Sequence, residues 1–98
     1  MSVYQVAKFK LGAGVTEEQF LAVEAKMRAG RIRQQAGFEG REVGKDATGA
    51  WFVIMRWSDE AAAKAWTPIF MQDPDGQQFA SMLDFPSMRQ ELFAISKL

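Results

Sequence analysis

The chain has no cysteine, no histidine and no asparagine among its 98 residues. Without cysteine it has no disulfide, no thiolate nucleophile and no Cys-ligated metal site. Without histidine it lacks the side chain that most readily exchanges protons near neutral pH and the commonest metal ligand. Any chemistry must therefore use carboxylates, the single tyrosine, lysine or arginine, or must come from the ligand itself.

An excess of charge of one sign is also missing, because 12 basic residues balance 12 acidic ones. No strong field exists to attract nucleic acid or an anionic membrane. The basic cluster in residues 26–33 follows three glutamates and is interpreted as a solvated helix face. The sequence has no signal-peptide pattern at its start and no run of ~20 apolar residues. We expect a cytoplasmic protein that binds neither nucleic acid nor membrane.

Apolar residues are plentiful, at 48% of the chain, and include eight Phe and three Trp. A disordered chain lacks such a composition. The length predicts a single domain over residues 1–98. A domain of this size buries only ~65% of the surface that its unfolded chain exposes, so association would add stability.

The hydrophobic periodicity predicts strands and helices in the order β-α-β-β-α-β, the ferredoxin-like α+β fold with a four-stranded antiparallel sheet. Thr16 and Gln19 form a capping box at the start of the first helix. Gly49 closes a hairpin turn between the second and third strands. The predicted strands are 3–11, 40–45, 50–57 and 88–96. The predicted helices are, after the Thr16 cap, 17 to about 35 and, after a Ser58 cap, 59–66, with breaks at Pro68 and Pro74 before a last helical segment, 77–83.

The third strand is apolar on both of its faces, which is typical of a strand that is covered on both sides. Trp51 and Trp57 lie on one face, whereas Phe52 and Ile54 lie on the other. The pattern leaves open which face meets the helices. Because two helices cover only one face, the other leaves a large apolar patch, and we expect a second copy to cover it in a homodimer.

A set of turn, cap and core residues spans nearly the whole chain: Gly14–Phe20 (GVTEEQF), Gly37-Phe38 with Arg41, Gly49 with Trp51, Trp57–Ala62 (WSDEAA), and Phe70, Pro74, Phe79 and Asp84 with Met88. In these residues the chain resembles the dimeric α/β-barrel superfamily, and within it the small proteins similar to antibiotic biosynthesis monooxygenases. The resemblance implies a barrel formed by the sheets of two subunits, with a pocket in each subunit between its sheet and its helices.

Members of this superfamily include cofactor-independent oxygenases of polycyclic aromatics, quinol oxygenases and haem-degrading enzymes. The iron-ligating histidine and the pocket asparagine of the haem-degrading branch have no counterpart here, since both residue types are absent. The resemblance therefore implies a protein without a cofactor.

Aromatic side chains and an arginine are the candidate pocket residues. A pocket for a flat ligand is mostly apolar with a few polar anchors, although aromatics are also common in an ordinary core. Arg41, Arg56 and Arg89 lie on or beside strands, where an arginine holds a carboxylate or enolate, or forms an ion pair at the surface or the dimer interface. The candidate lining residues are Tyr4, Phe20, Trp51, Trp66, Phe70, Phe79 and Arg41.

Carboxylates offer further candidates for chemistry. Asp84 and Glu91 are general bases if they are partly buried, but Asp84 is more simply a loop residue after the second helix. Asp73 and Asp75 supply too few oxygen ligands for Mg²⁺ or Ca²⁺ and are interpreted as a helix cap and turn, so no metal site is predicted.

Two functions remain open at this level. The first is a cofactor-independent monooxygenase-like oxidation, in which a protein base removes a proton from a small aromatic or quinol-type substrate and the substrate carbanion reduces O₂. The number of aromatics near the predicted pocket favours it. The second is a non-catalytic dimeric module, binding a small apolar molecule or related to stress, which the lack of histidine and asparagine favours. An interior cavity that holds a charged side chain would favour a protein that uses a ligand.

Overall fold

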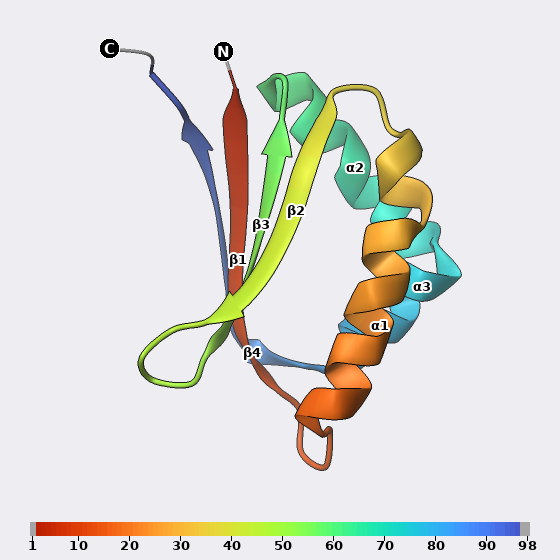
Figure 1. Cartoon of the computed structure of the whole chain (residues 1–98), viewed down its shortest axis with the longest axis vertical. Helices are drawn as coiled ribbons and strands as arrows, with labels where there is room; N and C mark the ends of the chain where they lie inside the picture. The colour runs from red at the N-terminus through yellow and green to blue at the C-terminus, as the bar shows by residue number, and fades with distance from the viewer. Residues whose placement is uncertain (1, 97–98) are drawn as a thin grey trace.

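A computed structural model describes residues 2–96 as a four-stranded antiparallel sheet with helices on one of its faces (Figure 1). The strands are β1 (Val3–Leu11), β2 (Phe38–Lys45), β3 (Trp51–Trp57) and β4 (Leu83–Ala94), in the spatial order β2-β3-β1-β4. The helices are α1 (Glu17–Ala29), the 3₁₀ helix η1 (Arg31–Gln34), α2 (Glu60–Gln72) and α3 (Pro74–Ser81). This strand order is the ferredoxin-like one, so the predicted fold class is confirmed.

The local signals at the first helix and the hairpin are confirmed. Thr16 Oγ1 accepts a hydrogen bond from the Gln19 amide at 3.1 Å, and the Gln19 side chain accepts one from the Thr16 amide at 3.0 Å. This capping box satisfies two of the amides that a helix start leaves unpaired. Gly49 has a φ of 85°, which glycine adopts without a steric cost at the hairpin turn.

The first helix is shorter than predicted, because α1 ends at Ala29 and not near residue 35. Gly30 has a ψ of −142°, outside the helical region, although its amide still donates to the Met27 carbonyl. The chain then continues as η1, and Gly37, with a φ of 83°, leads it into β2. The continuous apolar periodicity concealed this break, since glycine alone is a weak stop signal.

The predicted break at Pro68 is wrong, because α2 passes through this residue. A proline removes the amide that would bond to the carbonyl one turn earlier and crowds that carbonyl, which disfavours a helix without excluding it. The helix ends at Gln72 with Asp73 as its C-cap, and Pro74 begins α3 as predicted. The N-cap of α2 is Asp59 rather than Ser58, since Asp59 Oδ1 accepts from the Ala62 amide at 2.8 Å.

Strand β4 begins earlier than the sequence pattern predicts. Asp84 pairs with Lys10 and Arg89 pairs with Lys8, so residues 85–88 bulge out opposite a single residue of β1. A bulge interrupts the alternation of inward and outward side chains, which is the signal by which a strand is recognised. The last helix correspondingly spans α3 and not residues 77–83.

The structure also decides which face of the sheet meets the helices. Every second residue of β3, from Trp51 to Trp57, is buried, and Figure 1 shows the helices together on one side of the sheet. Phe52 and Ile54 point to the opposite, uncovered face and are half-buried by their strand neighbours. No helix within residues 2–96 is long and apolar enough to cross a membrane.

Two aromatic clusters fill the space between the sheet and the helices. Phe20 is central to the first, with its ring centroid 4.9 Å from that of Trp51 and 5.5 Å from that of Phe79. In the second, Trp57 and Trp66 lie 6.4 Å apart. Members of both clusters line the cavity described next.

Candidate functional site

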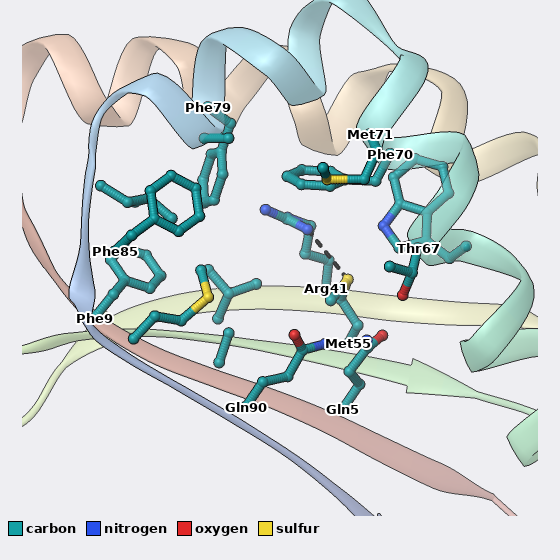
Figure 2. Close-up of a pocket in the computed structure, with 16 residues that line it drawn as sticks. Gln5, Phe9, Arg41, Met55, Thr67, Phe70, Met71, Phe79, Phe85 and Gln90 are labelled. Atoms are coloured by element: carbon teal, nitrogen blue, oxygen red, sulfur yellow. Dashed lines mark hydrogen bonds between the residues drawn. The ribbon is translucent and has the colours of Figure 1, made fainter.

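A cavity of about 190 Å³ lies between the sheet and helices α2 and α3 (Figure 2). Strand residues form its floor, and α2, α3 and the β4 bulge form its walls. It is lined by Gln5, Ala7, Phe9, Arg41, Val53, Met55, Trp66, Thr67, Phe70, Met71, Phe79, Ala80, Leu83, Phe85, Met88 and Gln90. Most of these side chains are apolar, as in ligand pockets generally.

Three of the six aromatic candidates line this cavity. Trp66 and Phe70 come from α2, Phe79 comes from α3, and the Phe70 ring lies 6.2 Å from each of the other two. Trp66 is in the continuous part of α2, so its inward position results from helical spacing with Ala63 and not from a helix break. These three rings form a wall against which a flat molecule can pack.

Tyr4, Phe20 and Trp51, predicted to line the pocket, do not. Side chains alternate along a strand, so Tyr4 lies on the uncovered face of the sheet, opposite to the face on which Gln5 lies. Phe20 is fully buried against Phe79, on the side away from the cavity, and Trp51 packs on Phe20. Phe20 and Trp51 therefore belong to the core.

Arg41, the seventh candidate, lines the cavity and is one of its few polar groups. Its side chain is only 2% exposed and forms an ion pair with Glu24 of α1, which is 3% exposed. Arg41 Nε donates to Glu24 Oε2 at 2.9 Å, and Nη2 donates to Oε1 at 2.8 Å. Arg41 is thus buried within the subunit, unlike the surface or interface pair that was the alternative interpretation.

The remaining end of the Arg41 guanidinium faces the cavity. Nη1 donates to the thioether sulfur of Met55 at 3.2 Å, and the guanidinium carbon lies 5.3 Å from the centre of the Phe79 ring. Figure 2 shows this group among the lining side chains, with the dashed bond to Met55. A thioether is a weak acceptor, so a ligand oxygen would make a stronger bond with Nη1.

Gln5 and Gln90 are polar lining residues that the sequence interpretation missed. Gln5 Oε1 accepts a hydrogen bond from Trp57 Nε1 at 3.1 Å, which orients the Gln5 amide. Along β1, Gln5 points to the same face of the sheet as the buried residues Val3 and Phe9. A polar residue at such an inward-facing strand position is the sequence signal that could have identified it. Glu24 gives the same signal on α1.

The remaining charged candidates lie away from this cavity. Arg56 and Arg89 pair with Tyr4 and Lys8, which places both arginines on the uncovered face. Asp84 lies at the edge of the β4 bulge, outside the lining. Glu91 lies beside a second, more open cleft between α2 and β4 that shares Gln5, Thr67 and Gln90 with the cavity.

Groups able to move protons or bind metals are scarce at the site. The described lining residues include no aspartate, glutamate, lysine or tyrosine. In the part of the chain that the structure describes, no acidic side chains gather in a group that would hold a metal ion. Arg41 is therefore the one charged side chain among the described lining residues.

Exposed apolar side chains mark the mouth of the cavity. Met71, at the end of α2, is 62% exposed, and Phe85, in the β4 bulge, is 57% exposed, although both line the cavity. A ligand that enters here would cover part of these two apolar side chains and so remove apolar surface from water.

A family model described as "Antibiotic biosynthesis monooxygenase" matches residues 2–68, more than half of the chain. The chain belongs to the antibiotic biosynthesis monooxygenase family. The match includes Arg41, Trp66 and the lining residues of β1 and β3, whereas the lining residues from Phe70 onward lie beyond it. No curated protein matches the chain.

Solved structures show the same fold. A mutant of SnoaB, a cofactor-independent oxygenase from Streptomyces nogalater, has a TM-score of 0.76 at 19% identity, covering 99% of this chain and 95% of that one. Rv0793 from Mycobacterium tuberculosis has a TM-score of 0.72 at 14% identity, covering 100% and 98%. A dimeric ferredoxin-like protein of unknown function from a Jannaschia species has a TM-score of 0.71 at 12% identity, covering 97% and 100%.

Proposed function

We propose that this protein oxidises a small hydroxyaromatic or quinol-type substrate with O₂, without a cofactor, in the cavity between its sheet and helices. The observation that carries the proposal is the Arg41 guanidinium, which presents Nη1 to an otherwise largely apolar cavity. Membership of the antibiotic biosynthesis monooxygenase family and the likeness to SnoaB support the reaction class.

The substrate itself supplies the reducing power in this proposal. Loss of a proton from an aromatic hydroxyl or its keto tautomer gives an electron-rich anion that transfers electrons to O₂. Oxidation of a ring CH₂ to a carbonyl consumes one O₂ and releases one water, so the atoms balance without a further reductant. Arg41 Nη1 would stabilise the developing oxyanion, the term that is usually largest in such catalysis.

The predicted protein base is not among the described lining residues, because Asp84 and Glu91 lie elsewhere. In the proposed reaction the substrate proton therefore passes to water at the cavity mouth. A hydrogen bond donated by Nη1 to the substrate oxygen is stronger for the anionic form and so lowers the pKa of the hydroxyl. Arg41 would promote deprotonation in this way without receiving the proton.

The size of the cavity favours a substrate of one or two rings. An apolar cavity of about 150 Å³ holds a benzene molecule, and the present one has about 190 Å³. A larger polycycle would have to extend into the open cleft between α2 and β4. The wall of Trp66, Phe70 and Phe79 would hold the ring by packing, which leaves Arg41 to orient its oxygen.

Oxygen consumption tests the proposal. The purified protein is given hydroquinones and hydroxynaphthalenes, then anthrones, with the uncatalysed rate subtracted. We expect uptake with the one- and two-ring compounds and a loss of about 100-fold or more in kcat for Arg41→Gln. Trp66→Ala should mainly raise KM. The exposed Arg33→Gln, on η1, is the control and should retain wild-type rates. Equal rates in the wild type and Arg41→Gln would contradict the proposal.

A non-catalytic binding protein is the second candidate. It is favoured by the lack of any acidic or basic proton acceptor among the described lining residues. In that case the same compounds would raise the melting temperature of the wild type and not of Trp66→Ala, while oxygen uptake stays at the uncatalysed rate.

We also propose that two copies pair through their uncovered sheet faces. This face carries the half-buried Val6, Phe52 and Ile54 in neighbouring positions. Val6 and Ile54 are flanked at the edges by Glu91 and Glu42, while Phe52 lies in the next row with Lys8 and Arg89. If the two-fold axis passes between these two rows, the acidic row of one copy faces the basic row of the other and complements an apolar centre.

Sedimentation tests this assembly. The wild type should sediment as a dimer at micromolar concentration, and Ile54→Glu should sediment as a folded monomer, because a carboxylate would be buried at the centre of the interface. Leu21→Glu, at an exposed apolar position of α1, is the matched control and should remain dimeric. A wild-type monomer at this concentration would exclude the pairing.

A further inference from the structure

Glu24 lies just behind the cavity, on the far side of Arg41. Its carboxylate receives two hydrogen bonds from the guanidinium, at 2.9 Å and 2.8 Å, and it is not one of the described lining residues. Both side chains are almost fully buried. A ligand in the cavity would thus meet the donor end of Arg41 but not the carboxylate.

This arrangement separates the two properties of Arg41, its charge and its directed N–H groups. The charge is compensated by Glu24 at contact distance, so the cavity as a whole is close to neutral. The N–H groups of Nη1 remain directed towards Met55 and the cavity. The other cation near Glu24 is Arg28, whose Nε lies 3.9 Å from Oε2 with a side chain 52% exposed to solvent, where water screens it.

We propose that Glu24 is a positioning and specificity-determining residue that makes this cavity select uncharged oxygen-bearing aromatics and reject carboxylates. It holds Nη1 in its direction through the paired bonds to Nε and Nη2. It also removes the net positive charge that would otherwise attract an anion into the apolar interior. A carboxylate ligand would bring a second negative charge beside Glu24, and burial of an uncompensated charge is costly.

This inference takes its ligand class from the proposed function, but its test does not depend on catalysis. Benzamide and benzoate have nearly the same shape and differ in charge, so the ratio of their dissociation constants reports the charge preference of the site. The wild type should bind benzamide more tightly than benzoate. Glu24→Gln leaves Arg41 uncompensated and should shift the ratio towards benzoate by about tenfold or more, the size of effect that a nearby opposite charge produces.

Arg28→Gln is the matched control, since it removes the other charge near Glu24 and should change the ratio less than about twofold. Bound 4-nitrophenol gives a spectroscopic readout, because its anionic form is coloured. Its apparent pKa should fall by about 1 unit or more from the wild type to Glu24→Gln. Calorimetry gives the constants, and circular dichroism checks that each variant is folded.

Several outcomes would overturn the inference. If the Glu24–Arg41 pair only joins α1 to β2, folded Glu24→Gln will have the same ratio of benzamide to benzoate dissociation constants as the wild type. That result would overturn the inference. If that variant does not fold, the wild type still decides, because tighter binding of benzoate, or no binding of benzamide, contradicts the inference. Absence of oxygen uptake together with the expected ratios would instead refute the proposed oxidation and leave this inference standing.

Discussion

Ala7→Leu tests whether the cavity is unfilled space within the fold. Ala7 lies on the cavity floor, between Val53 of β3 and Gln90 of β4. Leucine adds about three methylene equivalents, worth about 2.4 kcal/mol when buried. Ordering the side chain costs about 0.5–1 kcal/mol. A cavity of about 190 Å³ accommodates the addition, so we expect a net gain of about 1.5 kcal/mol in the free energy of unfolding.

Urea and thermal unfolding measure this gain. A rise of about 1.5 kcal/mol corresponds to roughly 6–12 °C in Tm for a domain of this size. The control is Ala22→Leu on the exposed face of α1, where the change should lie within about 0.5 kcal/mol. The same Ala7→Leu variant should lose aromatic ligand binding and oxygen uptake. If it were instead destabilised by about 1–3 kcal/mol, as an overpacked core is, the cavity would not be available to a ligand.

The remaining predictions concern the turns. The Thr48 hydroxyl, followed by the Lys8 ammonium, holds the pKa of the Asp46 carboxyl well below its usual range. Because the folded-state pKa is lowered, Asp46 stabilises the fold above the unfolded pKa of about 4 and loses that effect as the pH falls. Chemical denaturation should therefore find wild type more stable than Asp46→Asn at neutral pH, with a difference that closes on acidification; a constant difference would contradict the stabilising role of the Asp46 carboxylate. Gly37→Ala should be destabilised more than Gly49→Ala, although both glycines have a positive φ. A Cβ at Gly37 would lie 2.6 Å and 2.7 Å from side-chain atoms near the start of α2, whereas a Cβ at Gly49 meets nothing within 4 Å. Gly49→Ala should cost about 1–2 kcal/mol from backbone strain alone, and equal losses in thermal unfolding would contradict the role of the clash.

Much of the fold could be predicted because its signals are local. The capping box at Thr16, the glycine of the hairpin turn and the alternation in β1 and β3 each act within a few residues, and each was confirmed. The errors arose where a local rule competes with packing. Pro68 is tolerated because the rest of α2 is held against the sheet, and the β4 bulge removes the alternation that marks a strand.

The candidate site was less predictable, since it depends on which side chains meet across the fold. Trp66, Phe70, Phe79 and Arg41 were identified from residue type and the family resemblance, and they line one cavity. The same reasoning included Tyr4, which the alternation of β1 places on the other face. Residue type states what a side chain can do, whereas its position depends on register and helix phase.

The element order and the main turns could be inferred from the amino-acid sequence, because they follow from local conformational preference and hydrophobic periodicity. The packing of the helices was needed to establish that the Trp51 face of the sheet is the covered one. It also decided that Glu24, 17 residues before Arg41, compensates the guanidinium inside the subunit. Such a pairing arises when two distant elements pack, and no local pattern encodes the distance between their side chains.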